Sequence, residues 1–248
     1  MSTIFQSSNP LLSEQKITNA AGSAASEGIF IQEKATVSGA ATKTFILFGL
    51  MLITALISYV MPSSFLMIAG SIGGLIAVLV ASFKPTASPV AAPVYALFEG
   101  LVIGSVSAYF AQTMDGIIFQ ATSLTMGTLL TMLLVYKTGI IPVTNKFRMV
   151  VAMATGAIFF VYLINMIMGF FGMNIPFLHD SSWTSIGISI FVIIVASMNL
   201  LLDFDSFEKA EQNNAPKYME WFCALGLMVT LIWLYLEFLR LLSKLNNR

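Results

Sequence analysis

Six acidic side chains gather in the last third of the chain, where two long apolar runs meet. They are Asp203, Asp205, Glu208, Glu211, Glu220 and Glu237. The first five crowd a short hydrophilic break, whereas Glu237 lies inside the second apolar run. A charged side chain at the centre of a transmembrane helix costs about 2.5–3.5 kcal/mol on insertion scales, so such residues usually face the protein interior and mark function. Proton or cation binding by carboxylates is therefore the chemistry that this stretch suggests.

The composition predicts that these acids belong to an all-α membrane protein. Of the 248 residues, 57% are hydrophobic and only 10% are charged, too few charges for the surface of a soluble domain. Seven apolar segments are each close to the roughly 20 residues needed to cross a bilayer. They cover residues 44–61, 64–83, 93–113, 117–136, 149–172, 184–205 and 218–243. We expect residues 1–43 to be a mostly disordered cytoplasmic tail and residues 44–248 to be the transmembrane domain.

The basic residues predict the orientation in the membrane. Nine Lys and Arg residues fall in the tail and in the second-to-third, fourth-to-fifth and sixth-to-seventh connections, and none falls in the other three. This bias places the N-terminus in the cytoplasm. We expect a multi-pass protein of the inner membrane. Seven crossings then put the C-terminus outside, although it carries Arg240, Lys244 and Arg248. Either this basic end is carried across or the last segment re-enters. The absence of proline between residues 217 and 242 favours one straight helix.

Helical phase separates two of the acids on the sixth segment. Steps of three and four residues back from Asp203 reach a small and polar stripe that suits helix packing, namely Asn199, Ala196, Val192, Ser189 and Ser185. The same steps from Asp205 reach Leu201, Met198, Ile194 and Ile190, an apolar and lipid-like face. We therefore expect Asp203 to point into the bundle. Asp205 should lie at the wet interface, paired with Lys209 four residues later.

Depth in the membrane sorts the other acids. Glu99 lies about two turns into the third segment, and Glu220 begins the seventh, so both should share the cytoplasmic depth of Asp203. Glu237 lies roughly 25 Å further along the seventh helix, near the outer mouth. Three carboxylates at one depth repel each other, so at least one should keep its proton near neutral pH. Asp203, Glu220 and Glu99 together would sense pH or bind a cation weakly.

Other chemistry finds little support. One cysteine and one histidine exclude a disulfide framework and a Cys/His metal cage. Cys223, in the middle of an apolar run, should be a small buried hydrophobic side chain. Phosphate-binding loops, HExxH and GxSxG are absent from the sequence. We therefore expect no cofactor and no enzymatic activity, and a net charge of zero gives no reason to expect a nucleic-acid partner.

Several stretches resemble the bacterial branch of the Bax inhibitor 1 family, the YccA-like or transmembrane Bax-inhibitor-motif proteins. They are SSNP (7–10), APVYALFEG (92–100), KFR (146–148), NLLLDFDSFE (199–208), APKYMEWF (215–222) and TLIWLYLEFLRLL (230–242). The resemblance implies seven helices, with the last helix in the centre and six others around it. It also implies a pH-sensitive calcium leak, gated by an acid pair on the sixth and last helices.

The residues of that acid pair follow only in part from the resemblance. Asp203 matches the member on the sixth helix. Its partner is Glu237 by the LYLEF motif, or Glu220 by depth. Relatives also hold the closed state with an arginine near the early helices, but this chain has no arginine before Arg148. Lys84 is the only basic residue near that region and is a possible latch.

Three functions remain open from the sequence. The first is a pH-sensitive leak for calcium or another cation, or a regulator of such a conductance, in the bilayer. The second is a non-transporting regulator that binds other membrane proteins, such as a membrane protease. The third is a proton-coupled transporter of small solutes. Buried acids along a central stripe favour conduction, whereas function in the tail and loops would favour the regulator.

Overall fold

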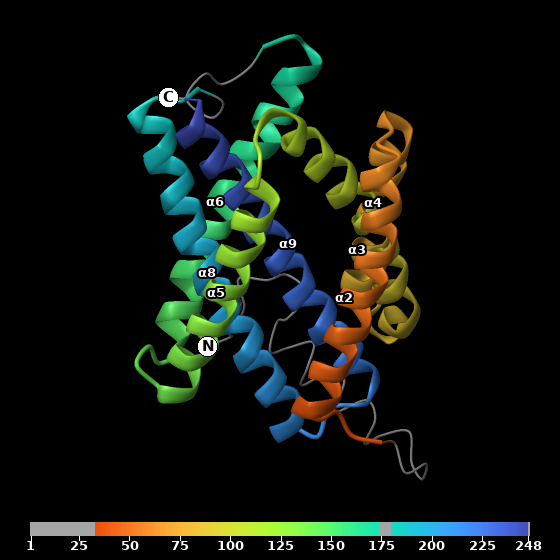
Figure 1. Ribbon diagram of the computed structural model, residues 1–248. Helices are drawn as coiled ribbons and strands as arrows, with labels where there is room; N and C mark the ends of the chain where they lie inside the picture. The colour runs from red at the N-terminus through yellow and green to blue at the C-terminus, as the bar shows by residue number, and fades with distance from the viewer. Residues whose placement is uncertain (1–32, 174–179, 248) are drawn as a thin grey trace.

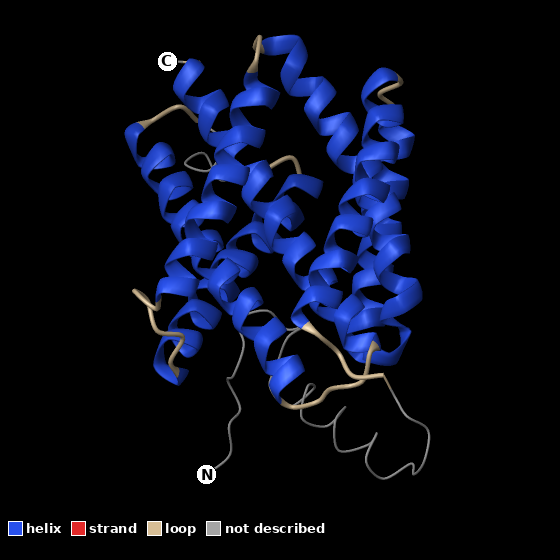
Figure 2. Cartoon of the chain, turned by 60° about the horizontal axis from the view of Figure 1, so that its bottom comes forward, coloured by secondary structure: helices blue, strands red, loops and turns tan. Residues whose placement is uncertain are grey.

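The computed structural model describes residues 33–173 and 180–247, and these residues form helices without a strand (Figure 2). Seven helices are long and apolar enough to cross a membrane, as the sequence predicts. They are α2 (Val37–Val60), α3 (Ser64–Phe83), α4 (Ser88–Thr113), α5 (Ile117–Thr138), α6 (Asn145–Phe170), α8 (Trp183–Gln212) and α9 (Tyr218–Asn246). One 3-10 turn, η1 (Pro85–Ala87), joins α3 to α4.

The last helix is central, as expected. Figure 1 shows α9 running diagonally through the middle of the bundle, and α2, α4, α5 and α8 all pack against it. The other two helices lie further out, since α3 packs mainly on α4 and α6 packs on α8. The bundle thus consists of two groups of three helices, α2–α3–α4 and α5–α6–α8, which are joined chiefly through α9.

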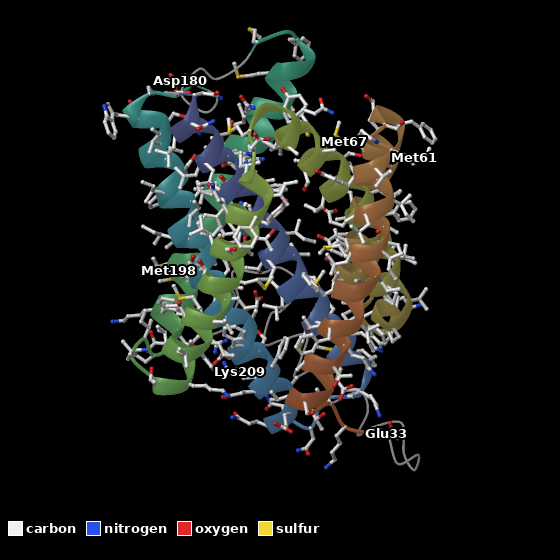
Figure 3. All side chains as sticks on the ribbon, in the orientation of Figure 1. Glu33, Met61, Met67, Asp180, Met198 and Lys209 are labelled. Carbon is white, nitrogen blue, oxygen red and sulfur yellow. The ribbon has the colours of Figure 1, made fainter. Side chains whose placement is uncertain are left out.

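The two ends of the bundle can be followed in Figure 3. Glu33 and Lys209 lie at the lower end, whereas Met61, Met67 and Asp180 lie at the upper end. Because α9 is one uninterrupted helix, the chain crosses the bundle seven times and ends opposite Glu33. The last segment is therefore one straight helix, as expected.

The first helix begins earlier than predicted. It starts at Val37 rather than at residue 44, because the side chain of Thr36 accepts a hydrogen bond from the Gly39 amide and caps the helix. Residues 37–43, assigned from the sequence to the tail, are thus helical. The predicted disorder of residues 1–32 concerns a part of the chain outside the described residues.

Two other boundaries differ from the prediction. The sixth crossing continues to Gln212, so Glu208, Lys209 and Glu211 lie on the last turns of α8 and not in a hydrophilic break. These residues favour helix, and Asp205 and Lys209 add an ion pair across one turn. The third crossing begins at Ser88, so Pro93 lies inside α4 and does not open it.

Close helix packing holds the α2–α3–α4 group together. A Cβ at Gly104 would lie 2.9 Å from the Ala55 carbonyl carbon of α2, and one at Gly70 would lie 2.6 Å from the Phe98 carbonyl oxygen of α4. Backbones can approach this closely only where side chains are absent. The hydroxyls of Ser58 and Ser105, 2.5 Å apart, join α2 to α4 as well. Gly70 and Gly104 thus lie on packing surfaces between helices.

Candidate functional site

A buried ion pair ties α6 to α8 in the lower half of the bundle. Arg148, in the first turn of α6, donates a hydrogen bond to Asp205 of α8. Their side chains are only 3% and 14% exposed. Lys209 lies 3.7 Å from the same carboxylate, which confirms the predicted pairing of Asp205 with Lys209. The wet interface predicted for Asp205 is wrong, because α8 continues past it and Arg148 covers it.

Two further polar side chains extend this ionic cluster. The Tyr136 ring of α5 packs against Phe204 with centroids 5.9 Å apart, and Tyr136 lies within electrostatic range of Glu208, Asp205 and Arg148. The lower cluster therefore joins α5, α6 and α8 through Tyr136, Arg148 and Asp205. Arg148 follows the most basic loop of the chain, and the charges of such loops are usually solvated. Its position in the sequence therefore did not indicate a role in the site.

Asp203 points into the bundle, as its helical phase predicts. It is fully buried, and so are Asn199, Ala196 and Ser189 on the same stripe. Two contacts fix the register between α8 and α9. The Cys223 thiol lies 3.9 Å from the Ser206 carbonyl oxygen, and the Lys244 ammonium lies 2.9 Å from the Ser189 hydroxyl. This antiparallel register places Asp203 opposite the stretch 226–230 of α9.

Cys223 is a buried small side chain, as expected, with no exposed surface. It lies within electrostatic range of both Asp203 and Glu220. Along the axis of the bundle, Asp203 therefore lies above the contact that Cys223 makes with α8, and Glu220 lies below it.

Glu220 closes the lower end of α2. Its Oε1 accepts hydrogen bonds from the backbone amide and from the hydroxyl of Thr36, each at 3.1 Å. A carboxylate at a helix N-terminus is also favoured by the helix dipole. The side chain is 3% exposed although it lies at the end of the bundle. Glu220 thus binds the N-cap residue of α2, a contact that no pattern in the sequence indicates.

The residues around Glu220 fasten the start of α2 to the α8–α9 loop. The Ala35 amide donates to the Ala215 carbonyl at 2.8 Å, and Lys217 forms an ion pair with Glu33. Glu33 accepts a hydrogen bond from Lys217, and the positive charge of Lys217 favours the ionised carboxylate. The pKa of Glu33 is therefore lowered from its ordinary value. Lys43 also lies 5.1 Å from the centre of the Trp221 ring, a cation–π contact.

Glu99 faces another part of the bundle. Its Oε2 would lie 3.0 Å from a Cβ built on Gly74, so the side chain packs against α3. The predicted three-carboxylate cation site is not assembled, since no three acidic, His or Cys side chains among the described residues lie close enough to hold a metal ion. The reason is that Glu99, Glu220 and Asp203 face three different neighbours. Lys84, the possible latch, is exposed at the end of α3.

The upper half of the bundle holds a second buried carboxylate. Glu237 has no exposed surface, and its Oε1 accepts from the Tyr162 hydroxyl at 2.8 Å and from Arg240 at 2.6 Å. The Arg240 guanidinium also lies 5.1 Å from the centre of the Tyr162 ring. Glu237 thus lies beside Arg240 at the end where the sequence placed it.

Two basic side chains of the C-terminal end contact polar groups of the protein. Lys244 is 8% exposed and donates to the Ser189 hydroxyl and the Ser185 carbonyl of α8. Arg240 forms an ion pair with Glu237, although its side chain remains 43% exposed. Two of the three basic residues that conflict with the loop bias therefore have partners within the protein.

These features define a multi-pass helical membrane protein with ionisable side chains buried along its central helices. A family model described as Bax inhibitor 1 like matches residues 9–247. The chain therefore belongs to the Bax inhibitor 1 like family, as the sequence resemblance indicates. Comparisons with curated proteins and with solved structures gave no match.

Proposed function

We propose that the protein is a pH-sensitive leak for calcium or another small cation, or a regulator of such a conductance. We place it in the inner membrane of a bacterial cell, with the lower end of the bundle and the N-terminus in the cytoplasm. The Lys and Arg residues support this orientation, because the lower connections carry all those outside the tail and α9. Neither a cofactor nor an enzymatic step is part of the proposal.

The observation that carries the proposal is the buried Arg148–Asp205 pair, two residues along α8 from the fully buried Asp203. Removing charges from water is costly, and a buried pair is weak support for stability. Ionisable groups within membrane spans are a functional-site hypothesis by default. Proton binding by the side chains of this buried cluster would make the conductance depend on pH.

The geometry suggests how protons would change the state of the protein. In the arrangement described here, Asp205 holds α6 through Arg148, and Glu220 holds α2 through Thr36. Protonation of either carboxyl removes the charge that its partner binds. The lower ends of α6 and α2 would then separate from the α8–α9 pair and admit ions.

Calcium flux into proteoliposomes of purified protein, measured between roughly pH 6 and 8, tests the proposal. The parent protein should conduct in a pH-dependent manner. Asp205→Asn should flatten the profile because the carboxylate that binds Arg148 is lost, and Asp203→Asn tests the neighbouring buried acid in the same assay. Asp115→Asn, in the exposed turn before α5, is the matched control and should leave the profile unchanged. A parent protein without flux would overturn the leak, and it would direct attention to the regulator that binds other membrane proteins.

A further inference from the structure

Helix α6 is attached to the rest of the bundle mainly through polar side chains. Arg148 binds Asp205, Thr155 accepts a hydrogen bond from Asn199 at 2.9 Å, and Tyr162 binds Glu237. The three residues of α6 recur every seven positions, so they lie on one face of the helix, two turns apart. The face of α6 toward α8 and α9, here called the α6 seam, is therefore polar at three successive levels.

The three levels cover most of the membrane. Seven residues of helix rise about 10.5 Å, so Arg148 and Tyr162 are separated by roughly 21 Å of a hydrocarbon core about 30 Å thick. On the other side of the seam, Asn199 continues the buried stripe of α8 that ends in Ser189 and Ser185. Polar groups thus follow one another along the α6 seam from the lower to the upper end.

Apolar packing along the α6 seam is sparse. Ile158 is the buried α6 residue of a small cluster with Val192 and Val195. A cavity of about 290 Å³ between α6 and α8 is lined by Tyr162 and otherwise by apolar side chains, so it shows loose packing of the two helices and not a polar site. The glycine-mediated contact of α2 with α4 is far closer. Hydrogen bonds between membrane helices contribute little individually, because a separated helix finds other partners. Helix α6 is accordingly easier to displace than α2, α3 or α4.

A second cavity, like the one beside Tyr162, offers no charged ligands to an ion. It measures about 360 Å³ and lies between α2, α4, α5 and α9. None of the described residues that line it is Asp, Glu, Lys, Arg or His, and most are apolar. A cation entering it would lose hydration without gaining charged oxygen ligands, as at a hydrophobic constriction.

The α6 seam, by contrast, holds oxygen atoms that are available to bind a cation. Glu237 Oε2 and Ser185 Oγ are buried and have no hydrogen-bond partner among the described residues. Carboxylate and hydroxyl oxygens are the ligands that small hard cations prefer. We propose that the conducting path runs along the α6 seam, between carboxylates at its two ends, and that Thr155 and Asn199 form its narrowest polar point. This inference rests on the proposed conductance and names its route.

Crosslinking across the seam tests the route. In a Cys223→Ala background, Thr155→Cys with Asn199→Cys would be joined by a short bis-methanethiosulfonate linker after purification, and completion would be checked by mass spectrometry. Calcium flux should fall at least tenfold and should return after reduction, because α6 can no longer separate from α8. Linking after folding keeps the test independent of how well the variant folds.

The matched control is a crosslink of the same kind within the other group of helices. Ser58→Cys with Ser105→Cys joins α2 to α4, whose hydroxyls lie 2.5 Å apart, and should leave flux within about twofold of the parent. A complete Thr155–Asn199 crosslink with unchanged flux would overturn the route while leaving the conductance intact. A parent without flux would instead refute the proposed function itself.

A spectroscopic readout addresses the movement of α6 without any flux. Spin labels at Phe160 of α6 and Ile194 of α8, which are 61% and 48% exposed, report the width of the seam. Asp205→Asn should lengthen and broaden their distance distribution, because the lower contact of α6 is lost. A control pair at Ile57 of α2 and Tyr109 of α4 should not change. An unchanged seam distance in the Asp205→Asn variant would show that α6 does not move.

Discussion

The carboxyl group of Glu220 occupies the space in which a side chain at Gly39 would lie. A Cβ built on Gly39 would overlap the carboxyl oxygens of Glu220, so the first turn of α2 and the first turn of α9 interlock at this point. The same carboxylate accepts both hydrogen bonds from Thr36. Glycine is required at position 39 for this close approach and not for its backbone conformation, since the residue lies in a regular helix.

Gly39→Ala should therefore displace Glu220 and lower the thermal midpoint of unfolding in detergent. Loss of hydrogen bonds to a charged group costs on the order of 1–3 kcal/mol. Replacing glycine by alanine in a helix otherwise stabilises by roughly 0.5–1 kcal/mol. Gly49→Ala is the control, because a Cβ there meets nothing within 4 Å, and it should raise the midpoint or leave it unchanged. Equal midpoints for the two variants would contradict the contact.

Arg148 and Asp205 should behave as one unit. Removing one partner of a buried pair leaves an uncompensated charge and costs about 3–5 kcal/mol, so Asp205→Leu alone should lower the midpoint strongly. The double variant Arg148→Met with Asp205→Leu removes both charges and should recover most of that loss. Lys209, which also lies near Asp205, is unchanged in the single and the double variant. A difference in midpoint between these two variants therefore reports on Arg148. Single and double variants of equal stability would exclude a strong buried pair.

The helices and their inward faces could be predicted because they follow from local rules. Apolar runs of membrane length mark the crossings, and the period of 3.6 residues identifies the stripe from Ser185 to Asp203 that proves to be buried. The exact ends were harder to predict, since a cap such as Thr36 or a polar helical end such as that of α8 resembles loop sequence.

The partners of the acids could not be predicted in the same way. Asp205 meets Arg148 across 57 residues, and Glu220 meets Thr36 across 184 residues, so only the packing of whole helices brings them together. Arg148 follows a basic loop, where charges usually serve orientation. One signal was available in the sequence, namely polar side chains at Arg148, Thr155 and Tyr162 with a spacing of seven residues.

The topology gives a third prediction. Cysteine labelling in a Cys223→Ala background should find Ser181→Cys and Asn247→Cys accessible from the same side of the membrane, which we expect to be the outside. Asn213→Cys, exposed in the turn after α8, should label only from the opposite side. If Asn247→Cys labels together with Asn213→Cys, then α9 does not cross the membrane as one straight helix.

The partner of Asp203 in gating is the last question, and the register of α8 and α9 sharpens it. Of the two contacts that fix the register, that of Cys223 with Ser206 is the nearer to Asp203, and it places Asp203 opposite Gly226. Glu220 is then about 9 Å away along the helix axis, and Glu237 about 17 Å away in the other direction. The LYLEF motif favours Glu237, whereas the register favours Glu220 as the nearer carboxylate. We therefore expect Asp203 to couple more strongly to Glu220.

A double-mutant cycle on the pH dependence of flux decides between the two. Asp203→Asn would be combined with Glu220→Gln in one cycle and with Glu237→Gln in the other, and each single variant is the control for its cycle. Sites that interact or share a neighbour give non-additive effects, whereas sites more than about 7–10 Å apart with no shared partner usually add. Asp203 and Glu220 share Cys223 as a neighbour. The cycle with Glu220 should deviate clearly from additivity and the cycle with Glu237 should not. Strong coupling to Glu237 alone would show that α9 shifts along α8 during gating, because the register described here keeps those two carboxyls too far apart for contact.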